Sequence, residues 1–303
     1  MSNFEDQTKL LIQVLATVVR NSSYALKGGT AINFFYSNMP RLSVDIDLAY
    51  TKINSREEFL NENIDFCNQT AQLLTKKHGL IVKTLTTSDN VPKQLLISSR
   101  NTQIKTDINL VLRGTVYPTV IKTSCDLIRQ KYGIRHQINI LSFEDIYAGK
   151  FCAALDRQHP RDLFDVLMFF KENLITEKLK KAFLVYLLSG NRPISEMLNP
   201  NRLNQLQAFK NEFEGMTDIS ITYQDLEAAR ERLIHEVHKT LTEEDKDFLI
   251  SFKIGSPKWE LLGIDHVQTM PAIKWKLFNI NKIDKLKHAE ALKELRRKLD
   301  KLT

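Results

Sequence analysis

The chain has 303 residues, of which 43% are hydrophobic, so it can bury a sizeable core and is longer than one ordinary domain requires. Its 43 Lys and Arg exceed its 36 Asp and Glu, and the net charge of +7 favours an anionic partner such as nucleic acid. No apolar run reaches the roughly 18 residues of a membrane span, and the start, MSNFEDQTK, does not resemble a secretory signal. We therefore expect a cytoplasmic protein of two domains with no membrane segment.

The cysteine pattern gives no sign of a disulfide framework or a zinc site. Cys67, Cys125 and Cys152 are odd in number and far apart, and no pair has the C-x-x-C spacing. All three are expected to be reduced thiols in the core.

The first part of the chain predicts helices and strands in alternation. Apolar residues recur at helical spacing over 10–19, and a short apolar helix is expected between Gly29 and Pro40. The segment 43–50, SVDIDLAY, alternates like a strand, and 55–78 again has helical spacing. Three short segments rich in Val, Ile, Leu and Thr follow between 79 and 112 and predict an antiparallel or mixed sheet.

Helices dominate the rest of the chain. One is expected from Ser142, which with Asp145 resembles a capping box, and Pro160 is placed to begin the next, RDLFDVLMFF. Beyond Thr176 the strand signal mostly vanishes, and successive amphipathic segments read as helices. The expected fold class is α+β, with a mixed sheet flanked by helices in a domain at 1–175 and a helical bundle domain at 176–303.

The acidic pair in VDIDLAY is the first candidate site. Because side chains alternate between the faces of a strand, Asp45 and Asp47 project to the same side. Two carboxylates that close repel one another unless a cation neutralises them, and their hard oxygens suit Mg²⁺ or Mn²⁺. An acidic pair facing water on a surface strand is the alternative.

Gly28-Gly29-Thr30 lies upstream of this pair. Glycine lets the backbone approach a phosphate closely, a helix is expected to begin directly afterwards, and the hydroxyl of Thr30 could contact the same phosphate. Together the two segments predict a site for a metal and a nucleoside triphosphate, in which metal ions bridge the phosphates. Alone, the glycines would indicate only a turn.

Two further groups could complete such a site. Asp107 in TDINLVL is a third strand carboxylate that could serve as a metal ligand or general base, unless it merely pairs with Lys105. Lys150 and Arg157, seven residues apart on one helix face, could grip a triphosphate, unless they form ion pairs with Asp162 or Asp165 on the next helix.

With these pieces in order, the chain resembles the AbiEii/AbiGii toxin family of nucleotidyltransferases, a branch of the polymerase-beta-like superfamily that includes the mycobacterial MenT toxins. KGGTAINFFY with PRLSVDIDLAY is similar to the family's first motif, EDIYAGKFCAALDR to its lysine helix and RDLFDVLMF to its R-D-x-x-D segment. PKWELL and MPAIKWKLFNI also look like family segments, so the resemblance covers most of the chain.

The resemblance implies a role for each matching residue. Gly29 and Thr30 correspond to the phosphate-binding turn, Asp45 and Asp47 to the metal-binding pair, and Lys150 to the lysine that contacts the triphosphate. Asp162 corresponds to the later catalytic acid, although Asp165 could take that role.

The resemblance also implies an activity and its setting. The expected protein is a toxin of a toxin–antitoxin or phage-defence (abortive infection) pair, which transfers a nucleotide from an NTP to RNA, in relatives to the tRNA 3′ end. A cognate antitoxin is a possible partner.

Two other functions remain open from the residues alone. A D-x-D pair also occurs as the metal and nucleotide-sugar clamp of glycosyltransferases, although these usually place it after a longer alternation of strands and helices. A basic helical domain could also belong to a non-catalytic module that binds nucleic acid or protein.

Overall fold

The computed structural model describes residues 3–302, which form two compact units. Unit 1 runs up to Ser142 and also includes Phe213–Ser220, whereas unit 2 comprises Phe143–Glu212 and the chain from Ile221 onward. The chain therefore passes between the units three times. The domain boundary expected near residue 175 stays a prediction. In the structure, residues 143–175 group with the later helices in unit 2.

Unit 1 is built on a mixed seven-stranded sheet with the order β3-β4-β5-β2-β1-β7-β6. The central strand β2 runs parallel to β5 and antiparallel to β1, and β1 runs parallel to β7. The mixed sheet expected from the sequence is thus present. Its strands are β1 (Tyr24–Lys27), β2 (Asp45–Tyr50), β3 (Ile81–Thr86), β4 (Pro92–Ser98), β5 (Gln103–Arg113), β6 (Val120–Thr123) and β7 (Gln137–Ile140).

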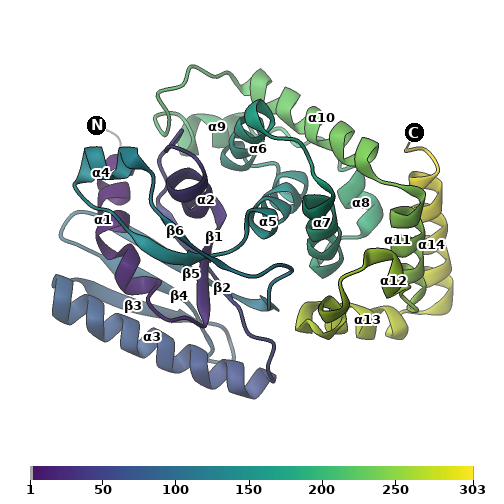
Figure 1. Cartoon of the computed structure of the whole chain (residues 1–303), viewed down its shortest axis with the longest axis horizontal. Helices are drawn as coiled ribbons and strands as arrows, with labels where there is room; N and C mark the ends of the chain where they lie inside the picture. The colour runs from purple at the N-terminus through teal and green to yellow at the C-terminus, as the bar shows by residue number, and fades with distance from the viewer. Residues whose placement is uncertain (1–2, 303) are drawn as a thin grey trace. The chain divides into compact units, whose positions relative to one another are not determined.

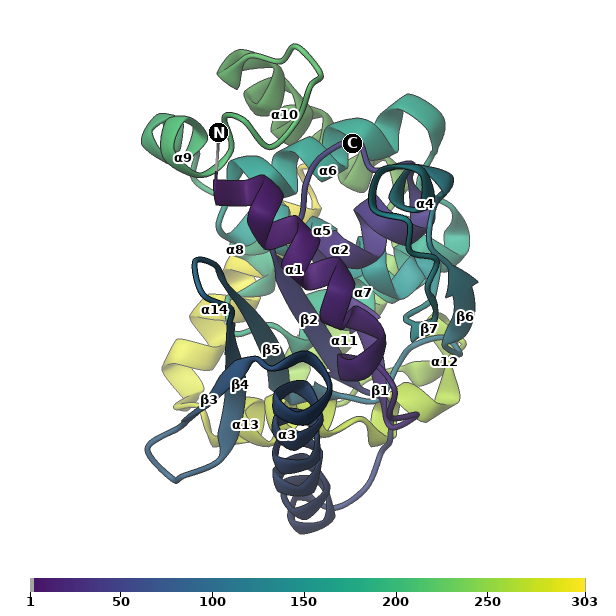
Figure 2. The ribbon, with the colours of Figure 1, turned by 90° about the vertical axis from the view of Figure 1, so that its left-hand side faces the viewer.

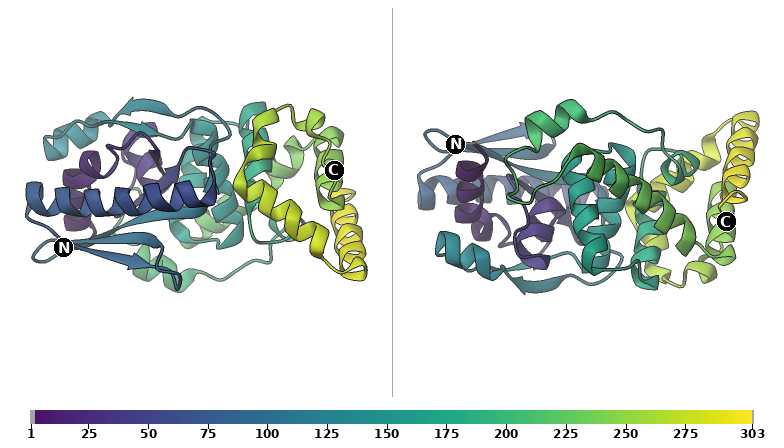
Figure 3. Two further views of the ribbon diagram at one scale, coloured as in Figure 1. Left: turned by 90° about the horizontal axis from the view of Figure 1, so that it is seen from below. Right: turned by 90° about the horizontal axis from the view of Figure 1, so that it is seen from above.

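Two long helices, α1 (Asn3–Val18) and α3 (Arg56–His78), cover one face of this sheet (Figures 2 and 3). The ring of Tyr24 on β1 stacks on Phe66 of α3 with centroids 4.0 Å apart, and Tyr50 on β2 meets Phe59 of α3 edge to face. The alternate residues of β2 point to the opposite face, which carries the acidic pair. Burial of one face thus fixes which face presents Asp45 and Asp47.

Local signals explain where the helices of unit 1 begin and end. The Ser55 side chain accepts from the backbone of Glu58 in a capping box that starts α3, and Gly79 closes α3 in the left-handed conformation. The glycine turn starts α2 (Gly28–Ala31), which continues as a π-helix, η1 (Ile32–Tyr36). The helix expected to stop at Pro40 therefore ends earlier. A further short helix is α4 (Asp126–Tyr132).

Unit 2 is entirely helical among its described residues (Figure 1). Helix α5 packs on α7, α6 packs on α10, and α14 packs on α8 and α11. Pro160 occupies the first turn of α6, as expected. The helices are α5 (Phe143–Asp156), α6 (Pro160–Glu172), α7 (Glu177–Ser189), α8 (Ile194–Leu198), α9 (Leu206–Glu212), α10 (Tyr223–Thr240), α11 (Glu243–Ile254), α12 (Trp259–Leu262), the 3₁₀ helix η2 (Asp265–Thr269), α13 (Pro271–Lys282) and α14 (Lys285–Leu299).

Two expectations from composition can be compared with the structure. Cys67 is a buried free thiol, as expected, whereas the free thiols Cys125 and Cys152 are only partly buried and so do not belong to the core. Over residues 3–302, none of the helices has the length and apolar character that crossing a bilayer requires.

Candidate active site

Three acidic side chains meet on the polar face of the sheet in unit 1. Asp47 on β2 lies opposite Asp107 on the parallel strand β5, and Asp45 lies opposite Lys105. The strand register therefore brings together the three carboxylates singled out in the sequence. All three are partly accessible from outside, whereas the alternate residues Ile46 and Leu48 are fully buried.

Gly28 lies directly against the acidic pair. Lys27 pairs with Asp47 across β1 and β2, so the glycine turn begins where β1 passes that carboxylate. A Cβ atom at Gly28 would overlap Asp47 Oδ2, and the φ of +72° at Gly28 is itself unfavourable for other residues. The absence of a side chain at residue 28 is thus what lets the Asp47 carboxylate occupy its place.

The Thr30 hydroxyl is used inside the protein. The side chain is fully buried, and its Oγ1 donates to the Asp45 carbonyl oxygen at 2.6 Å and lies 2.7 Å from the Ser43 hydroxyl. Thr30 therefore ties the glycine turn to the start of β2 and so positions Asp45. A contact between its hydroxyl and a phosphate stays a prediction.

Arg41 is a buried cation beside the glycine turn that sequence reasoning did not single out. Its side chain is only 4% exposed, it donates to the Leu42 carbonyl oxygen, and its Nη2 would lie 2.5 Å from a Cβ at Gly29. A side chain at residue 29 would therefore displace the Arg41 guanidinium, whereas residue 28 is restricted to glycine by both its φ and its contact with Asp47. In the sequence, the feature that could have drawn attention to Arg41 is its position four residues before Asp45, in PRLSVD.

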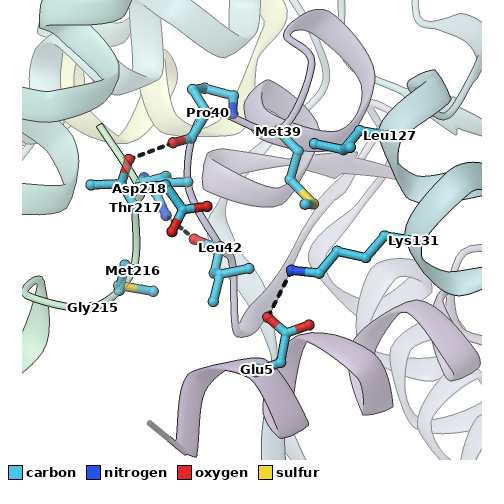
Figure 4. Close-up of a pocket in the computed structure, with 11 residues that line it drawn as sticks. Glu5, Met39, Pro40, Leu42, Leu127, Lys131, Gly215, Met216, Thr217 and Asp218 are labelled. Carbon is cyan, nitrogen blue, oxygen red and sulfur yellow. Dashed lines mark hydrogen bonds and ion pairs between the residues drawn. The ribbon is translucent and has the colours of Figure 1, made fainter. Parts of the chain in front are cut away.

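Arg41 also lines a pocket of about 380 Å³ in unit 1 (Figure 4). One wall is the segment 213–220, whose Met216 carbonyl accepts from Leu42 N and whose Thr217 Oγ1 donates to the Pro40 carbonyl, both at 2.7 Å. This segment therefore fastens the loop that leads into β2. The pocket is lined by Glu5, Met39, Pro40, Arg41, Leu42, Leu127, Lys131, Gly215, Met216, Thr217 and Asp218.

Asp107 is engaged by neighbours on its own sheet. Gln94 on β4 donates to its Oδ1 at 2.5 Å, and Lys105 Nζ lies 3.4 Å from its Oδ2 and 3.9 Å from Asp45 Oδ1. The pairing of Asp107 with Lys105 that the sequence offered as an alternative is therefore present. Gln94 was not foreseen, because only the register of β4 on β5 places it opposite Asp107.

The donor set fits one hard divalent cation. Mg²⁺ is commonly held by one or two carboxylates together with substrate phosphates and water, and Asp45 and Asp47 supply such a pair beside a turn without side chains. Among residues 3–302 no group of three or more His, Cys, Asp and Glu side chains is arranged to hold a metal ion. Asp107 as a third ligand stays a prediction.

A second cluster of predicted site residues lies within unit 2. Lys150 Nζ on α5 is 2.8 Å from both Asp162 Oδ1 and Asp165 Oδ2 on α6, and Arg157 donates to both oxygens of Asp162. The lysine and the two aspartates are at least nine-tenths buried, whereas the Arg157 side chain is 64% exposed. The ion pairs with Asp162 and Asp165 that the sequence analysis gave as an alternative are thus present, and most of their side chains lie in the interior.

The electrostatics of this cluster keep Asp162 ionised. Burial alone would raise the pKa of its carboxyl group, but the charge of Lys150 and the hydrogen bonds and charge of Arg157 hold that pKa well below its ordinary value. Asp162 therefore acts in this conformation as a fixed negative charge that holds Lys150 and Arg157 in place.

The comparisons with known proteins agree with this fold. A structure of MenT4, a nucleotidyltransferase toxin from Mycobacterium tuberculosis H37Rv, aligns over 97% of this chain and 95% of its own with a TM-score of 0.61 and 13% identity, which shows a shared fold. No curated protein sequence matches the chain significantly. The family model described as nucleotidyl transferase AbiEii toxin, type IV TA system, matches residues 9–279. The chain therefore belongs to the AbiEii family of nucleotidyltransferase toxins.

Proposed function

We propose that this nucleotidyltransferase toxin transfers a nucleoside monophosphate from an NTP to an RNA acceptor, with Mg²⁺ or Mn²⁺ held by Asp45 and Asp47. The observation that carries the proposal is the packing of Gly28 against the Asp47 carboxylate, which sets the acidic pair directly beside the glycine turn. The tRNA 3′ end is the proposed acceptor, as the family resemblance implies. Asp45 and Asp47 would hold the cation, which would supply neutralisation of the triphosphate charge. The RNA hydroxyl would attack the α-phosphorus, the bond from that phosphorus to the β-phosphate oxygen would break, and pyrophosphate would leave.

The residues of unit 1 prepare this chemistry by holding atoms in place. Gly28 and Gly29 let the turn pass closely against Asp47 and Arg41, and Thr30 fixes the backbone of Asp45. Asp107, which contacts Gln94 and Lys105, would accept a proton from the attacking hydroxyl. The first two roles support binding and the third supports the chemical step.

Lys150, Arg157 and Asp162 in unit 2 are proposed to act on the triphosphate. Two carboxylates already hold Lys150, so its contact with a phosphate would exchange one ion pair for another. The Arg157 side chain is mostly exposed, whereas Lys150 is buried, so Arg157 is the more accessible of the two cations for a phosphate. Asp162, or Asp165 in its place, would position these cations.

The family also bears on partners and setting. Membership of a type IV toxin–antitoxin family implies an antitoxin partner and an NTP substrate. We further propose an abortive-infection role and a cytoplasmic location, where NTP and tRNA are available. The family match favours nucleotidyl transfer over both the glycosyltransferase and the non-catalytic binding module that the residues alone left open.

A labelled-nucleotide assay tests the proposal. Purified protein is incubated with each α-labelled NTP, total tRNA and Mg²⁺, and transfer of label to RNA is followed on a gel, with and without EDTA. We expect transfer by the unaltered protein, none by Asp47→Ala, and normal transfer by Asp126→Ala, which removes an exposed carboxylate elsewhere in unit 1. No transfer with any NTP, or full activity of Asp47→Ala, would refute it.

A further inference from the structure

Helix α13 presents two large aromatic side chains to solvent. Trp275 is 60% exposed and Phe278 is 46% exposed, and their rings stack with centroids 5.6 Å apart and an interplanar angle of 22°. The other tryptophan of unit 2, Trp259, is partly buried and packs against the buried rings of Phe248 and Phe252. The α13 pair is exposed and therefore contributes little to the core of unit 2.

The same exposed face is basic. Lys282 Nζ lies 4.0 Å from the centre of the Phe278 ring, and Lys274 is exposed one turn before Phe278. Helix α13 contains three lysines and no Asp or Glu. The next carboxylate along the chain, Asp284, accepts hydrogen bonds from Leu286 N and Lys287 N as the cap of α14. Positive charge therefore surrounds the rings on this helix.

This combination fits a single-stranded nucleic acid better than a protein partner. Nucleobases stack on exposed aromatic rings regardless of sequence, while lysines beside the rings neutralise the backbone phosphates. Protein–protein interfaces are also rich in aromatic residues but are depleted in lysine. A ring pair framed by lysines and free of acidic neighbours on its helix is thus complementary to a polyanion that carries flat bases.

We propose that Trp275 and Phe278, with Lys274 and Lys282, form a stacking platform that binds unpaired nucleotides of the RNA acceptor. The platform rests on the proposed function only in that RNA is the acceptor, since it lies on α13 and uses none of the residues assigned to metal or NTP. It would hold the RNA through its bases and phosphates, independently of the chemical step.

Binding and transfer are therefore tested separately. Binding of a labelled single-stranded RNA is measured by fluorescence anisotropy in Asp47→Ala protein without NTP. Adding Trp275→Ala with Phe278→Ala should weaken binding by roughly ten-fold or more per stacked base, and Lys282→Ala should lower the salt dependence. Two matched controls should leave binding unchanged. Leu174→Ala removes an apolar side chain that is 72% exposed and lies outside the platform, and Lys210→Ala removes an exposed lysine.

Tryptophan fluorescence distinguishes stacking from simple charge attraction. The chain has two tryptophans, so Trp259→Phe leaves Trp275 as the sole emitter. RNA should quench that emission, whereas inorganic polyphosphate, which has no bases, should not. Unchanged RNA affinity of the double variant, or equal quenching by polyphosphate, overturns the platform. Sedimentation gives a third outcome that overturns the platform. If the unaltered protein self-associates and the double variant does not, while the double variant still binds RNA, then α13 forms a contact between protein chains.

The unaltered protein could show no nucleotidyl transfer and yet bind RNA in a way that depends on Trp275. That result would refute the proposed function and still support the RNA-binding platform. If the double variant transfers nucleotides to tRNA normally and binds RNA with unchanged affinity, the proposed function is supported and the platform is refuted.

Discussion

At the scale of single residues, Gly28 connects the backbone geometry of the nucleotide turn to the acidic strand. Its positive φ and its contact with Asp47 are separate requirements, and each excludes a side chain for its own reason. Gly79 offers a natural comparison, because its φ is also positive but nothing lies within 4 Å of where its Cβ would be.

We expect Gly28→Ala to reduce nucleotidyl transfer roughly 100-fold, because displacing the Asp47 carboxylate by even 1 Å misplaces the metal. Gly79→Ala should cost only the strain of the backbone, about 1 kcal/mol of unfolding free energy, and leave activity unchanged. Labelled-NTP transfer and urea denaturation of both variants provide the measurements. Equal losses of activity in the two would show that strain, and not the Asp47 contact, is what matters at residue 28.

Lys105 places a positive charge between two carboxylates of the candidate site. A cation bound by Asp45 must compete with that charge, which lies 3.9 Å from Asp45 Oδ1 and 3.4 Å from Asp107 Oδ2. We expect Lys105→Met to lower the Mg²⁺ concentration for half-maximal binding by roughly five-fold, since an exposed pair of this kind contributes about 1 kcal/mol. Mn²⁺ binding followed by electron paramagnetic resonance measures this directly. Lys83→Met on the exposed strand β3 is the control, and identical affinities would contradict the expectation.

The sequence predicts which acidic residues form this site better than it predicts the side chains that contact them. The period of two in VDIDLAY is enough to place Asp45 and Asp47 on one face, and the structure agrees. The distances from Lys105 and the hydrogen bond from Gln94 depend on which strands neighbour β5, and one strand's pattern cannot reveal its neighbours. Arg41 was missed for the same reason, because its burial depends on a segment 175 residues later that covers the loop.

At the scale of elements, helices α5 and α6 are joined by a buried network of charges. Asp162→Asn leaves Lys150 with one carboxylate and keeps only one of the two acceptor oxygens that Arg157 uses. We expect a loss of about 3–5 kcal/mol of unfolding free energy at pH 7, because a buried cation loses compensation. Asp156→Asn, which breaks an exposed pair with Arg192, should cost about 0–1 kcal/mol. Urea unfolding curves provide the comparison.

The pH dependence of this network has a definite sign. The pKa of Asp162 is lower in the folded protein than its ordinary value of 3.8, so its stabilisation is complete above that value and is lost as the pH falls below it. The difference in stability between the unaltered protein and Asp162→Asn should therefore be constant from pH 5 to 7 and shrink below about pH 4. A difference that grew on acidification would contradict the assignment of the low pKa to Asp162.

Elements with strong end signals were predicted well, and short elements were not. The helix expected over 55–78 is present as α3, which begins with a capping box, and Pro160 begins α6 as expected. Strands β1, β6 and β7 have four residues each, too few to establish a period, and only pairing with neighbours stabilises them. The π-helix after the glycine turn has no sequence signature that separates it from an α-helix.

At the scale of the whole chain, the two units are interleaved in sequence. Residues 213–220 belong to unit 1 although the segments on both sides belong to unit 2. No single cut can therefore separate the units, and composition alone cannot reveal this, because the returning segment is only eight residues long. Its hydrogen bonds to Pro40 and Leu42 make the loop before β2 dependent on a distant part of the sequence.

This dependence can be measured through Thr217. Thr217→Val keeps the shape of the side chain but removes the hydroxyl that donates to the Pro40 carbonyl, which should cost about 0.5–1.5 kcal/mol locally. We expect faster amide hydrogen exchange over residues 39–47 and a reduced rate of nucleotidyl transfer, with exchange in α11 and α14 unchanged. Thr269→Val removes a comparable exposed hydroxyl bond in unit 2 and should leave both readouts unaltered. If exchange in the 39–47 loop stayed at its original rate in Thr217→Val, the segment 213–220 would be shown to pack on the loop without holding it.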